Sequence, residues 1–276
     1  MNQLAPAKSI VAATYSAAAE HFDDPPLAFW SRIGNGTVSR VPLRPGDRVL
    51  DVCCGSGASA IPAAQAVGSR GSVLAVDLSD ALLDRGRAKA RALGLQNIDF
   101  RCADFEAIDV PPEHFDAVVC VFGIFFAADI PPAVQRLWRW IKPGGTLAIT
   151  TWGPDVLEPG NTAFWEAIRG HRPDLYRSFR PWERINTSDS LREMLAEAGV
   201  TASSVDAEHS HQTLDLPDDW WTIALGSGYR GTIDRLDPDT LHAVKRDTLG
   251  PLRARNALTA QTNALYAVAT KPSLSR

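Results

Sequence analysis

The sequence is short of cysteine, and the cysteines it has are not arranged as a scaffold. Four occur in 276 residues, at Cys53, Cys54, Cys102 and Cys120, and no two of them form a Cys-x-x-Cys pair. All four lie in apolar, strand-like runs, which suits buried thiols in a reducing compartment. This usage argues against a small secreted protein held together by disulfide bonds.

The sequence also lacks an excess of positive charge and a long apolar run. Lys and Arg total 28 against 32 Asp and Glu, so the formal net charge is −4. A mildly acidic chain has no general attraction for phosphate backbones or anionic lipids, so we expect no nucleic-acid partner. The longest run without a charged or polar residue is Ala117–Ala128. It is shorter than the ~20 residues that cross a bilayer, so we expect no membrane span.

The start of the chain has only a weak likeness to a secretion signal. Lys8 precedes an apolar stretch, Ile10–Ala19, but Thr14, Tyr15 and Ser16 interrupt it. We therefore expect a soluble, cytoplasmic protein.

The composition itself is that of an ordinary globular protein. The chain is 45% hydrophobic and 22% charged, and its 20 glycines and 19 prolines show no period, which excludes bulk disorder and fibrous repeats. A length of 276 residues allows one large domain or two small ones. Because we find no linker and no internal repeat, we expect one domain, with residues 1–45 helical and then loop-like.

From residue 48 onward, apolar strand-like runs alternate with helix-like segments. The runs are continuous rather than alternating, which indicates strands buried on both faces of a parallel sheet wound by right-handed crossovers. We expect strands at residues 48–54, 72–77, 98–103, 115–122 and 146–152, and helices at 58–67, 80–93 and 132–141. Later residues predict a helix at 188–198, a strand at 200–214, helices within 215–258 and a last strand at 263–270.

The most informative stretch is a strand that runs into a Gly-x-Gly turn at Gly55 and Gly57. Glycines there let the backbone approach a ligand, and ligands bind at this edge of a doubly wound sheet. Gly55, Gly57 and Ala60 also satisfy a relaxed dinucleotide pattern. However, Asp51 lies inside the preceding strand, where a carboxylate would repel a pyrophosphate and attract a cationic amino acid.

Two more carboxylates follow the next two strands. Asp77, at the end of the second strand, lies where a carboxylate accepts ribose hydroxyls. Asp104, after the third, is placed to accept from an adenine amino group. Each acid has a structural alternative: Asp51 as a turn cap, Asp77 as a helix cap in competition with Ser79, and Asp104 as a surface turn residue.

With these features the sequence resembles the class I S-adenosylmethionine (SAM)-dependent methyltransferases over residues 15–272. The motifs are VLDVCCGSG at residues 49–57, Asp77, Ala103-Asp104, FDAVVC at 115–120 and IKPGG at 141–145. Within that superfamily the chain is similar to the small-molecule branch that contains the ubiquinone/menaquinone-biosynthesis-type methyltransferases. One departure is the Cys53-Cys54 pair, where the family more often has Gly or Ala.

The resemblance implies an α/β, Rossmann-like, doubly wound sheet of seven strands in the order 3-2-1-4-5-7-6, with the last strand antiparallel. It implies an N-terminal helical lid at residues 1–45 and a SAM-binding domain at 46–276, with substrate-capping insertions at about 153–187 and 215–258. The implied cofactor is SAM, leaving as S-adenosylhomocysteine. The implied cofactor-binding residues are Asp51, Gly55, Ser56, Gly57, Asp77, Leu78, Ala103, Asp104, Phe105, Val121 and Phe122.

Within this set the resemblance divides the contacts. Gly55 and Gly57 would flank the methionyl part, and the backbone at Val121–Phe122 would hold its amino-acid end. Asp77 would hold the ribose, and Asp104 with Phe105 the adenine, although Phe105 also reads as a plain core residue.

Aromatic residues are expected to build the pocket for the methyl acceptor, which favours a small hydrophobic or aromatic metabolite. They lie before the first strand, after the fourth and fifth strands and before the last strand, and include Phe22, Trp30, Phe125, Phe164 and Phe179. The candidate substrate-binding residues are Tyr15, Phe126, Trp152, Trp221, Tyr229 and Arg230. Tyr15 and His21 are the candidate catalytic groups. His209 and His211 share a strand face, but no third ligand is placed by spacing, so we expect no metal.

Two other functions remain open from the sequence. An NAD(P)-dependent oxidoreductase would use the same glycine pattern, although no catalytic Tyr/Lys or His pair is evident. A catalytically idle SAM-binding regulatory module would keep the cofactor site alone. The sequence does not distinguish O-, N- or C-methylation, or a monomer from a homodimer.

Overall fold

A seven-stranded sheet forms the centre of the molecule. In the computed structural model, which describes residues 6–177, 180–200 and 203–273, the strand order is β3-β2-β1-β4-β5-β9-β6. All neighbours pair in parallel except β9, which is antiparallel to β5 and β6. The strands are β1 (Arg48–Val52), β2 (Ser72–Asp77), β3 (Ile98–Cys102), β4 (Phe115–Val121), β5 (Ile141–Trp152), β6 (Ser203–Glu208) and β9 (Ala264–Thr270). Because β9 is the seventh strand of this sheet, the predicted order and the antiparallel last strand are confirmed.

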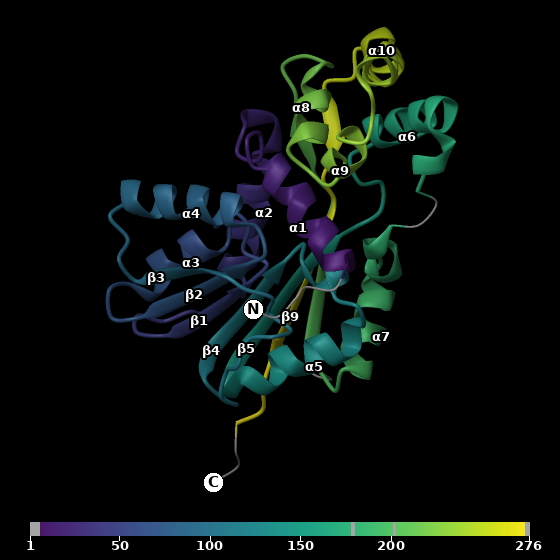
Figure 1. Cartoon of the computed structure of the whole chain (residues 1–276). Helices are drawn as coiled ribbons and strands as arrows, with labels where there is room; N and C mark the ends of the chain where they lie inside the picture. Colours follow the sequence, from purple (N-terminus) through teal and green to yellow (C-terminus); the bar gives the residue numbers. More distant parts are fainter. Residues whose placement is uncertain (1–5, 178–179, 201–202, 274–276) are drawn as a thin grey trace.

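Helices cover both faces of the sheet and leave two apolar cores (Figure 1). Side chains of β1 alternate between them, with Leu50 and Val52 in the larger core and Val49 in the smaller one. The smaller core is closed by α3 (Ala60–Val67) and the larger one by α5 (Ile130–Trp140) and α7 (Ser188–Glu197); α4 (Asp80–Ala92) contributes to both. Burial on both faces explains why the strand sequences are continuously apolar.

Helix α2 (Phe29–Ser39) lies alongside α3 and packs against β4 and β5. The other helices gather beyond the carboxyl ends of the strands (Figure 1). They come from both ends of the chain: α1 (Pro6–Ala18) and η1 (Pro25–Leu27) precede the sheet, and α6 (Gly160–His171), α8 (Asp219–Leu225), α9 (Arg230–Ile233) and α10 (Pro238–Ala254) follow β5. Short 3-10 turns lie at η2 (Ile124–Phe126), η3 (Pro173–Leu175) and η4 (Pro181–Ile185). Helix α1 packs against α9 and α4, and α6 packs against α10.

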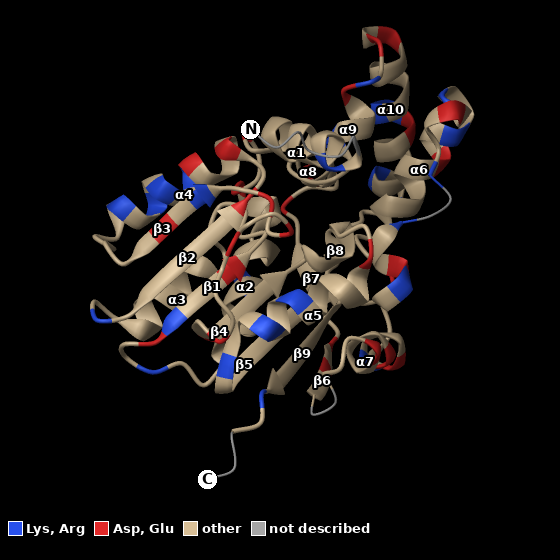
Figure 2. Ribbon diagram, turned by 60° about the horizontal axis from the view of Figure 1, so that its bottom comes forward, with Lys and Arg blue, Asp and Glu red and all other residues tan. Residues whose placement is uncertain are grey.

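Charged residues of both signs lie mainly on the outer helices, whereas the strands at the centre of the sheet carry few (Figure 2). None of the described helices is long and apolar enough to span a membrane.

One predicted strand is divided in the structure. Residues 200–214 were expected to form a single strand; β6 ends at Glu208, and His211–Thr213 form β7, which pairs with β8 (Thr259–Gln261) in a separate two-stranded sheet. The chain turns at Ser210, whose N–H donates to Asn263 Oδ1 at 3.0 Å and whose carbonyl accepts from Thr262 N at 2.8 Å. Residues 201 and 202 lie outside the described part of the chain.

The strand predicted at 146–152 begins five residues earlier, at Ile141. Residues 142–145 form an irregularity in β5, where the pairing with β4 shifts between Phe115↔Ile141 and Ala117↔Thr146. Gly144 has φ +80°, a conformation that favours glycine. The Lys-Pro-Gly-Gly segment therefore has a structural role.

Candidate functional site

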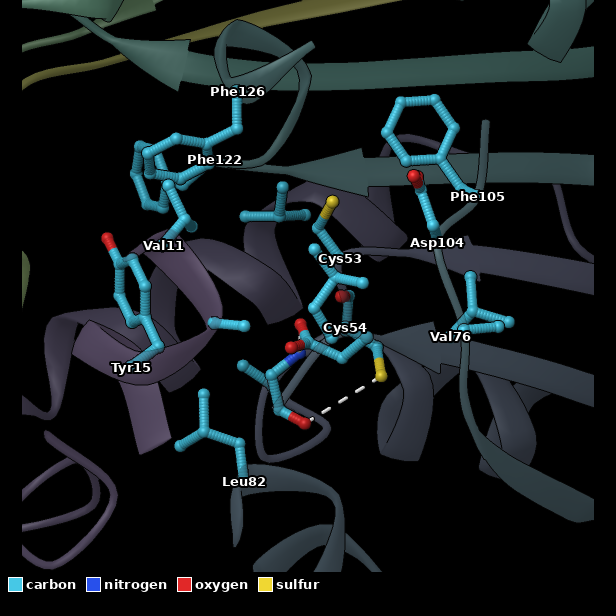
Figure 3. Close-up of a pocket in the computed structure, with 18 of the residues that line it drawn as sticks. Val11, Tyr15, Cys53, Cys54, Val76, Leu82, Asp104, Phe105, Phe122 and Phe126 are labelled. Atoms are coloured by element: carbon cyan, nitrogen blue, oxygen red, sulfur yellow. Dashed lines mark hydrogen bonds between the residues drawn. The ribbon is translucent and has the colours of Figure 1, made fainter. Parts of the chain in front are cut away.

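A pocket lies at the carboxyl edge of the sheet, beneath α1. It encloses about 980 Å³ of non-atom space, part of it open to solvent. Its wall comes from α1, the β1–α3 loop, the ends of β2 and β4, the segment after β3, and single residues of α2, α4 and η2. Figure 3 shows Asp104, Phe105 and Val76 on one side of it, and Tyr15, Phe122 and Phe126 on the other. The pocket thus has an acidic side and an aromatic side.

Of the eleven cofactor-binding residues expected from the sequence, eight lie in this wall: Gly55, Asp77, Leu78, Ala103, Asp104, Phe105, Val121 and Phe122. Asp51, Ser56 and Gly57 lie behind it. Ser56 Oγ donates to Asp23 Oδ1 at 2.7 Å, and a Cβ on Gly57 would lie 3.2 Å from the Phe100 ring, so both support the loop from outside the cavity.

The glycine loop is bonded directly to Asp77. Gly55, with φ +53°, donates its backbone N–H to Asp77 Oδ2 at 2.9 Å, and Ser79 N donates to Asp77 Oδ1 at 2.9 Å. Ser79 is the cap of α4, because its Oγ accepts from Leu82 N. Each Asp77 oxygen therefore keeps a lone pair for a ligand. Burial raises the pKa of Asp77 despite these bonds.

Asp104 is paired with a cation that sequence reasoning did not single out. Lys8 Nζ of α1 lies 2.6 Å from Asp104 Oδ2 and 2.5 Å from Glu106 Oε2. Asp104 Oδ1 accepts from Glu106 N at 3.0 Å. Burial alone would lower the pKa of Lys8, but the two acids raise it. No local pattern marks Lys8, because its partners follow 96 and 98 residues later in the chain.

Asp51 is buried next to the pocket rather than in its wall. It is 1% exposed, and its Oδ2 accepts from Ser59 Oγ at 2.7 Å; Ser59 itself lies in the wall. Its Oδ1 has no hydrogen-bond partner. Burial raises the pKa of Asp51 to about 7, and the nearby Asp77 contributes in the same direction.

Five aromatic side chains form the other side of the wall: Tyr15, Phe22, Trp30, Phe122 and Phe126. Trp30 stacks on Phe22 with ring centroids 5.2 Å apart, and Phe122 meets Trp30 edge-on at 5.5 Å. Tyr15 meets Phe126 edge-on at 5.8 Å. The Phe122 N–H donates to Thr150 O at 2.8 Å. The role expected for the backbone at 121–122 would therefore fall to carbonyl oxygens, which accept from an ammonium group.

The other candidates for substrate contact lie outside the wall. Trp152 stacks behind Phe122, with centroids 4.0 Å apart. Trp221 and Tyr229 are buried among α6, α8 and α9, where Tyr229 donates to Asn161 Oδ1 at 2.8 Å. Arg230 pairs with Asp234 at 2.6 Å. Phe179 lies outside the described residues.

The two catalytic candidates are placed differently. Tyr15 lies in the wall, and burial raises the pKa of its hydroxyl well above the usual range. His21 lies outside the wall, with Nδ1 2.9 Å from Asp24 Oδ2. Within the described residues, including His209 and His211, no group of three or more His, Cys, Asp or Glu side chains is placed to hold a metal ion.

Sequence reasoning also gave no role to the two adjacent cysteines, which both lie in the wall. Cys53 has φ +58°, and a Cβ on Gly123 would lie 2.3 Å from Cys53 Cβ. The closeness of Cys120 and burial raise the pKa of the Cys53 thiol. The signal in the sequence was the Cys53-Cys54 pair itself, and the structure adds that Cys53 adopts a left-handed backbone conformation that favours glycine.

The comparisons with known proteins point in one direction. Residues 49–145 match a family described as a methyltransferase domain. A 2-phytyl-1,4-naphtoquinone methyltransferase of Synechococcus elongatus is 44% identical over 124 residues, which cover 44% of this chain and 51% of that protein. The match thus spans about half the length of that relative.

A ubiquinone/menaquinone biosynthesis C-methyltransferase UbiE of Enterobacter sp. (strain 638) matches over a longer range. It is 30% identical over 214 residues, which cover 73% of this chain and 80% of that protein. Among solved structures, the YcgJ protein of Bacillus subtilis superposes with a TM-score of 0.58 at 16% identity, covering 88% of this chain and 99% of that one. This last likeness concerns the fold.

Proposed function

This chain belongs to the class I SAM-dependent methyltransferases of the quinone-biosynthesis type, and from that premise we propose that it transfers the methyl group of SAM to a small, largely hydrophobic, ring-containing acceptor. The observation that carries the proposal is the single pocket with two unlike sides. Carboxylates line one side of the pocket, and uncharged aromatic rings line the other. A polar cofactor and an apolar acceptor would therefore meet inside one cavity beneath α1.

The residues of the acidic side fit SAM. Asp77 has free lone pairs for the two ribose hydroxyls, because Gly55 N and Ser79 N use one position on each of its oxygens. Asp104 would accept from the adenine amino group, with Leu78 and Phe105 against the ring. Asp51 lies behind Ser59 with an unpartnered Oδ1, and burial raises its pKa to about 7, so its ionised form would place negative charge near the cationic methionyl end at and above that pH.

The same residues do not suit a dinucleotide. A pyrophosphate would face Asp77 and Asp104 in the wall and Asp51 behind it. Lys8 is the cation in the described wall, and two acids already pair with it. Repulsion in a buried site of low dielectric would be strong. We therefore place the oxidoreductase alternative below methyl transfer.

The chemistry that SAM supplies when bound is an electrophilic methyl carbon on a sulfonium sulfur. The chain itself would align the acceptor and exclude water. Alignment of two reactants contributes up to about 7–11 kcal/mol in favourable systems. Trp30, Phe22 and Phe122 form a packed wall for a flat ring, and residues of α1 line another part of the cavity.

The aromatic side provides no evident general base. The hydroxyl of Tyr15 stays protonated near neutral pH because its pKa is raised well above the usual range. The closeness of Cys120, together with burial, raises the pKa of the Cys53 thiol, so the thiol also stays protonated. His21 lies outside the wall. We infer that the acceptor atom reaches the site with an available lone pair, or already ionised, rather than losing its proton to the protein.

Calorimetry with SAM and with S-adenosylhomocysteine tests the cofactor assignment. The unmodified protein should bind both, and Asp77→Asn should weaken binding at least tenfold, because a carboxylate that accepts two hydroxyls becomes an amide. Asp80→Asn is the matched control, since Asp80 is exposed and outside the wall. Absence of binding at about millimolar cofactor, or equal binding by Asp77→Asn, would overturn the proposal.

Turnover separates the enzyme from an idle SAM-binding module. Incubation of the protein and SAM with a small-molecule metabolite extract should release S-adenosylhomocysteine above the level without extract. Cofactor binding without any such release would favour the regulatory module.

A further inference from the structure

Two cysteine side chains meet beside the glycine loop. A Cβ on Gly123 would lie 2.7 Å from Cys53 Sγ and 3.2 Å from Cys120 Sγ, so both sulfurs border the same small space next to that glycine. Cys120 is buried in β4, whereas Cys53 is partly exposed and belongs to the pocket wall. A small molecule in the cavity would therefore meet Cys53 first, with the second thiol close behind it.

An uncommon backbone conformation brings these two thiols together. In a regular strand successive side chains alternate between faces, so Cys53 would lie on the opposite face from Val52 and from Cys120, which pairs with Val52. Instead Cys53 has φ +58°, and its side chain packs against the larger core, to which Val52 and Cys120 belong. A positive φ is unfavourable for residues other than glycine, so the surroundings must hold Cys53 in this conformation.

The spacing of the two strands suits a disulfide bond. Val52 and Cys120 are partners in the parallel pairing of β1 with β4, and Cys53 is the next residue. With strands about 4.8 Å apart and a rise of about 3.3 Å per residue, the Cα atoms of Cys53 and Cys120 should lie about 6 Å apart. Disulfides join Cα atoms that are about 4.4–6.8 Å apart. The two cysteines can therefore be bonded after a small movement of the chain.

The other two cysteines are placed differently. Cys54 belongs to the smaller core, and its thiol points away from that of Cys53 and donates to the Gly55 carbonyl at 3.7 Å (Figure 3). Cys102 is exposed at the end of β3, and β2 and β1 separate that strand from β4. Among the four cysteines, all of which the structure describes, the pair that can form an internal disulfide is Cys53 with Cys120.

We propose that Cys53 and Cys120 are a redox-active dithiol, which hydrogen peroxide converts into a disulfide that weakens cofactor binding. A disulfide holds its sulfurs about 2.05 Å apart, much closer than unbonded sulfurs approach, so it would pull the start of the glycine loop toward β4. Two residues later Gly55 donates to Asp77, the carboxylate proposed to hold the ribose. The effect on binding rests on the proposed function, whereas formation of the disulfide does not.

The reaction with peroxide has two steps. The Cys53 sulfur attacks one peroxide oxygen, the O–O bond breaks, and the other oxygen leaves as water with the thiol proton, so that Cys53 becomes a sulfenic acid. The Cys120 sulfur then attacks the Cys53 sulfur, the S–O bond breaks, and a second water leaves with the Cys120 proton. Overall, two thiols lose two electrons and two protons, and one peroxide becomes two molecules of water.

The surroundings of the pair affect the rate of oxidation and the stability of the disulfide in different ways. The closeness of Cys120 and burial raise the pKa of the Cys53 thiol, so little thiolate is present at neutral pH and oxidation should be slow. The same surroundings do not stabilise the reduced thiolate, which favours the disulfide once it has formed. The pair should therefore stay reduced under ordinary reducing conditions and respond to sustained oxidant.

Thiol counting on the full-length protein tests the dithiol without any cofactor. After treatment with hydrogen peroxide, the number of thiols that react in denaturant should fall from four to two, and the intact mass should fall by two hydrogens. Cys54→Ala and Cys102→Ala are the matched controls, because each should lose two of its three thiols in the same way. Cys120→Ala should form no such bond.

Three outcomes of the thiol count overturn the proposal. The first is an unchanged count in the unmodified protein. The second is a gain of oxygen atoms without the loss of two hydrogens. The third is formation of the same internal bond in Cys120→Ala.

Calorimetry with S-adenosylhomocysteine before and after oxidation tests the effect on binding. The oxidised protein should bind at least about tenfold more weakly, as expected when a hydrogen bond to a charged group is disturbed, and dithiothreitol should restore both the affinity and the thiol count. Saturating S-adenosylhomocysteine should slow disulfide formation, because Cys53 lies in the wall that it would cover. Cys53→Gly, which suits the positive φ, should have the same affinity before and after peroxide. Unchanged affinity of the oxidised protein, or an equal loss in Cys53→Gly, contradicts the switch.

This inference and the proposed function can fail separately. If the thiol count falls but S-adenosylhomocysteine binds neither the reduced nor the oxidised protein, the cofactor assignment is wrong and the dithiol stands. If S-adenosylhomocysteine binds and the count stays at four, the proposed function stands and the dithiol is wrong.

Discussion

Lys8 in the first helix forms a 2.6 Å ion pair with Asp104, the carboxylate expected to receive an adenine amino group. Both side chains are mostly buried, at 16% and 14% exposure, and Lys8 also contacts Glu106. The pair joins the start of α1 to the segment after β3, and both residues line the pocket. The position of α1 over the pocket is thus coupled to a carboxylate proposed to bind the ligand.

Lys8→Met should accelerate cofactor release. Loss of an ion pair of about 1 kcal/mol corresponds to a roughly fivefold faster dissociation of S-adenosylhomocysteine, and added salt should accelerate release in the unmodified protein more than in the variant. Stopped-flow displacement measures both rates. Lys142→Met is the control, because Lys142 forms a 2.7 Å pair with Asp116 outside the wall. Equal dissociation rates in all three proteins would show that α1 is held by apolar packing alone.

Asp51→Asn should stabilise the protein at high pH. Burial raises the pKa of Asp51 to about 7, so between roughly pH 4 and 7 the native state holds a proton that the unfolded state releases. Stability from this group therefore falls as pH rises, by about 1.4 kcal/mol per unit over that interval. Urea denaturation at pH 4.5 and pH 8 should show a gain for Asp51→Asn that is larger at pH 8 by on the order of 2–4 kcal/mol. A gain independent of pH, or one matched by the exposed Asp99→Asn, contradicts this.

Asp23→Asn should have the opposite pH dependence. Asp23 accepts from Lys89 Nζ at 2.8 Å, Arg85 Nε at 2.9 Å and Ser56 Oγ at 2.7 Å. Burial would raise its pKa, but these bonds, led by Lys89, hold it below the usual value. The stabilisation from ionised Asp23 is therefore fully present above the pKa of Asp in the unfolded state, which is near 4. It is lost as the pH falls through the lower pKa that Asp23 has in the folded state. The variant should lose about 1 kcal/mol at pH 7, after allowance for partly exposed partners, and progressively less below pH 4. A loss that persists undiminished at pH 2.5 would point to packing instead.

Gly34→Ala should disturb the packing of α2 against the glycine loop. A Cβ there would lie 2.4 Å from the backbone oxygen of Ala58, which is too close without movement of the backbone. We expect a loss of about 2–3 kcal/mol in unfolding free energy and weaker binding of S-adenosylhomocysteine. Gly250→Ala in α10 is the matched control, because nothing lies within 4 Å of its Cβ. That control should gain about 0.5–1 kcal/mol from helix propensity. Equal effects of the two substitutions on chemical denaturation would contradict the close packing.

Much of the fold could be predicted from the sequence, because the patterns that indicate its strands and turns are local. Continuous apolar runs identified the central strands, and the glycines and Asp77 lie at strand ends that topology brings to one edge of the sheet. Ser79 was recognisable as the better cap of α4, which leaves Asp77 for a ligand. Predictions were weaker after Trp152, where β6 and β7 are divided by contacts of Ser210 with residues more than fifty positions away.

The sequence by itself determined a parallel sheet, a glycine turn, and two acids placed after successive strands. These follow from periodicity and from the direction of parallel strands, which need no knowledge of distant contacts. The antiparallel last strand was implied by the resemblance to a known family and not by the periodicity. Only the tertiary structure decided that Lys8 pairs with Asp104, that Asp51 lies behind Ser59, and that Trp30 lines the cavity while Trp152 packs behind Phe122. The sequence around an aromatic residue or a lysine looks the same whether its side chain lines the cavity or packs elsewhere. Only the packing of distant helices determines which of these side chains faces the cavity.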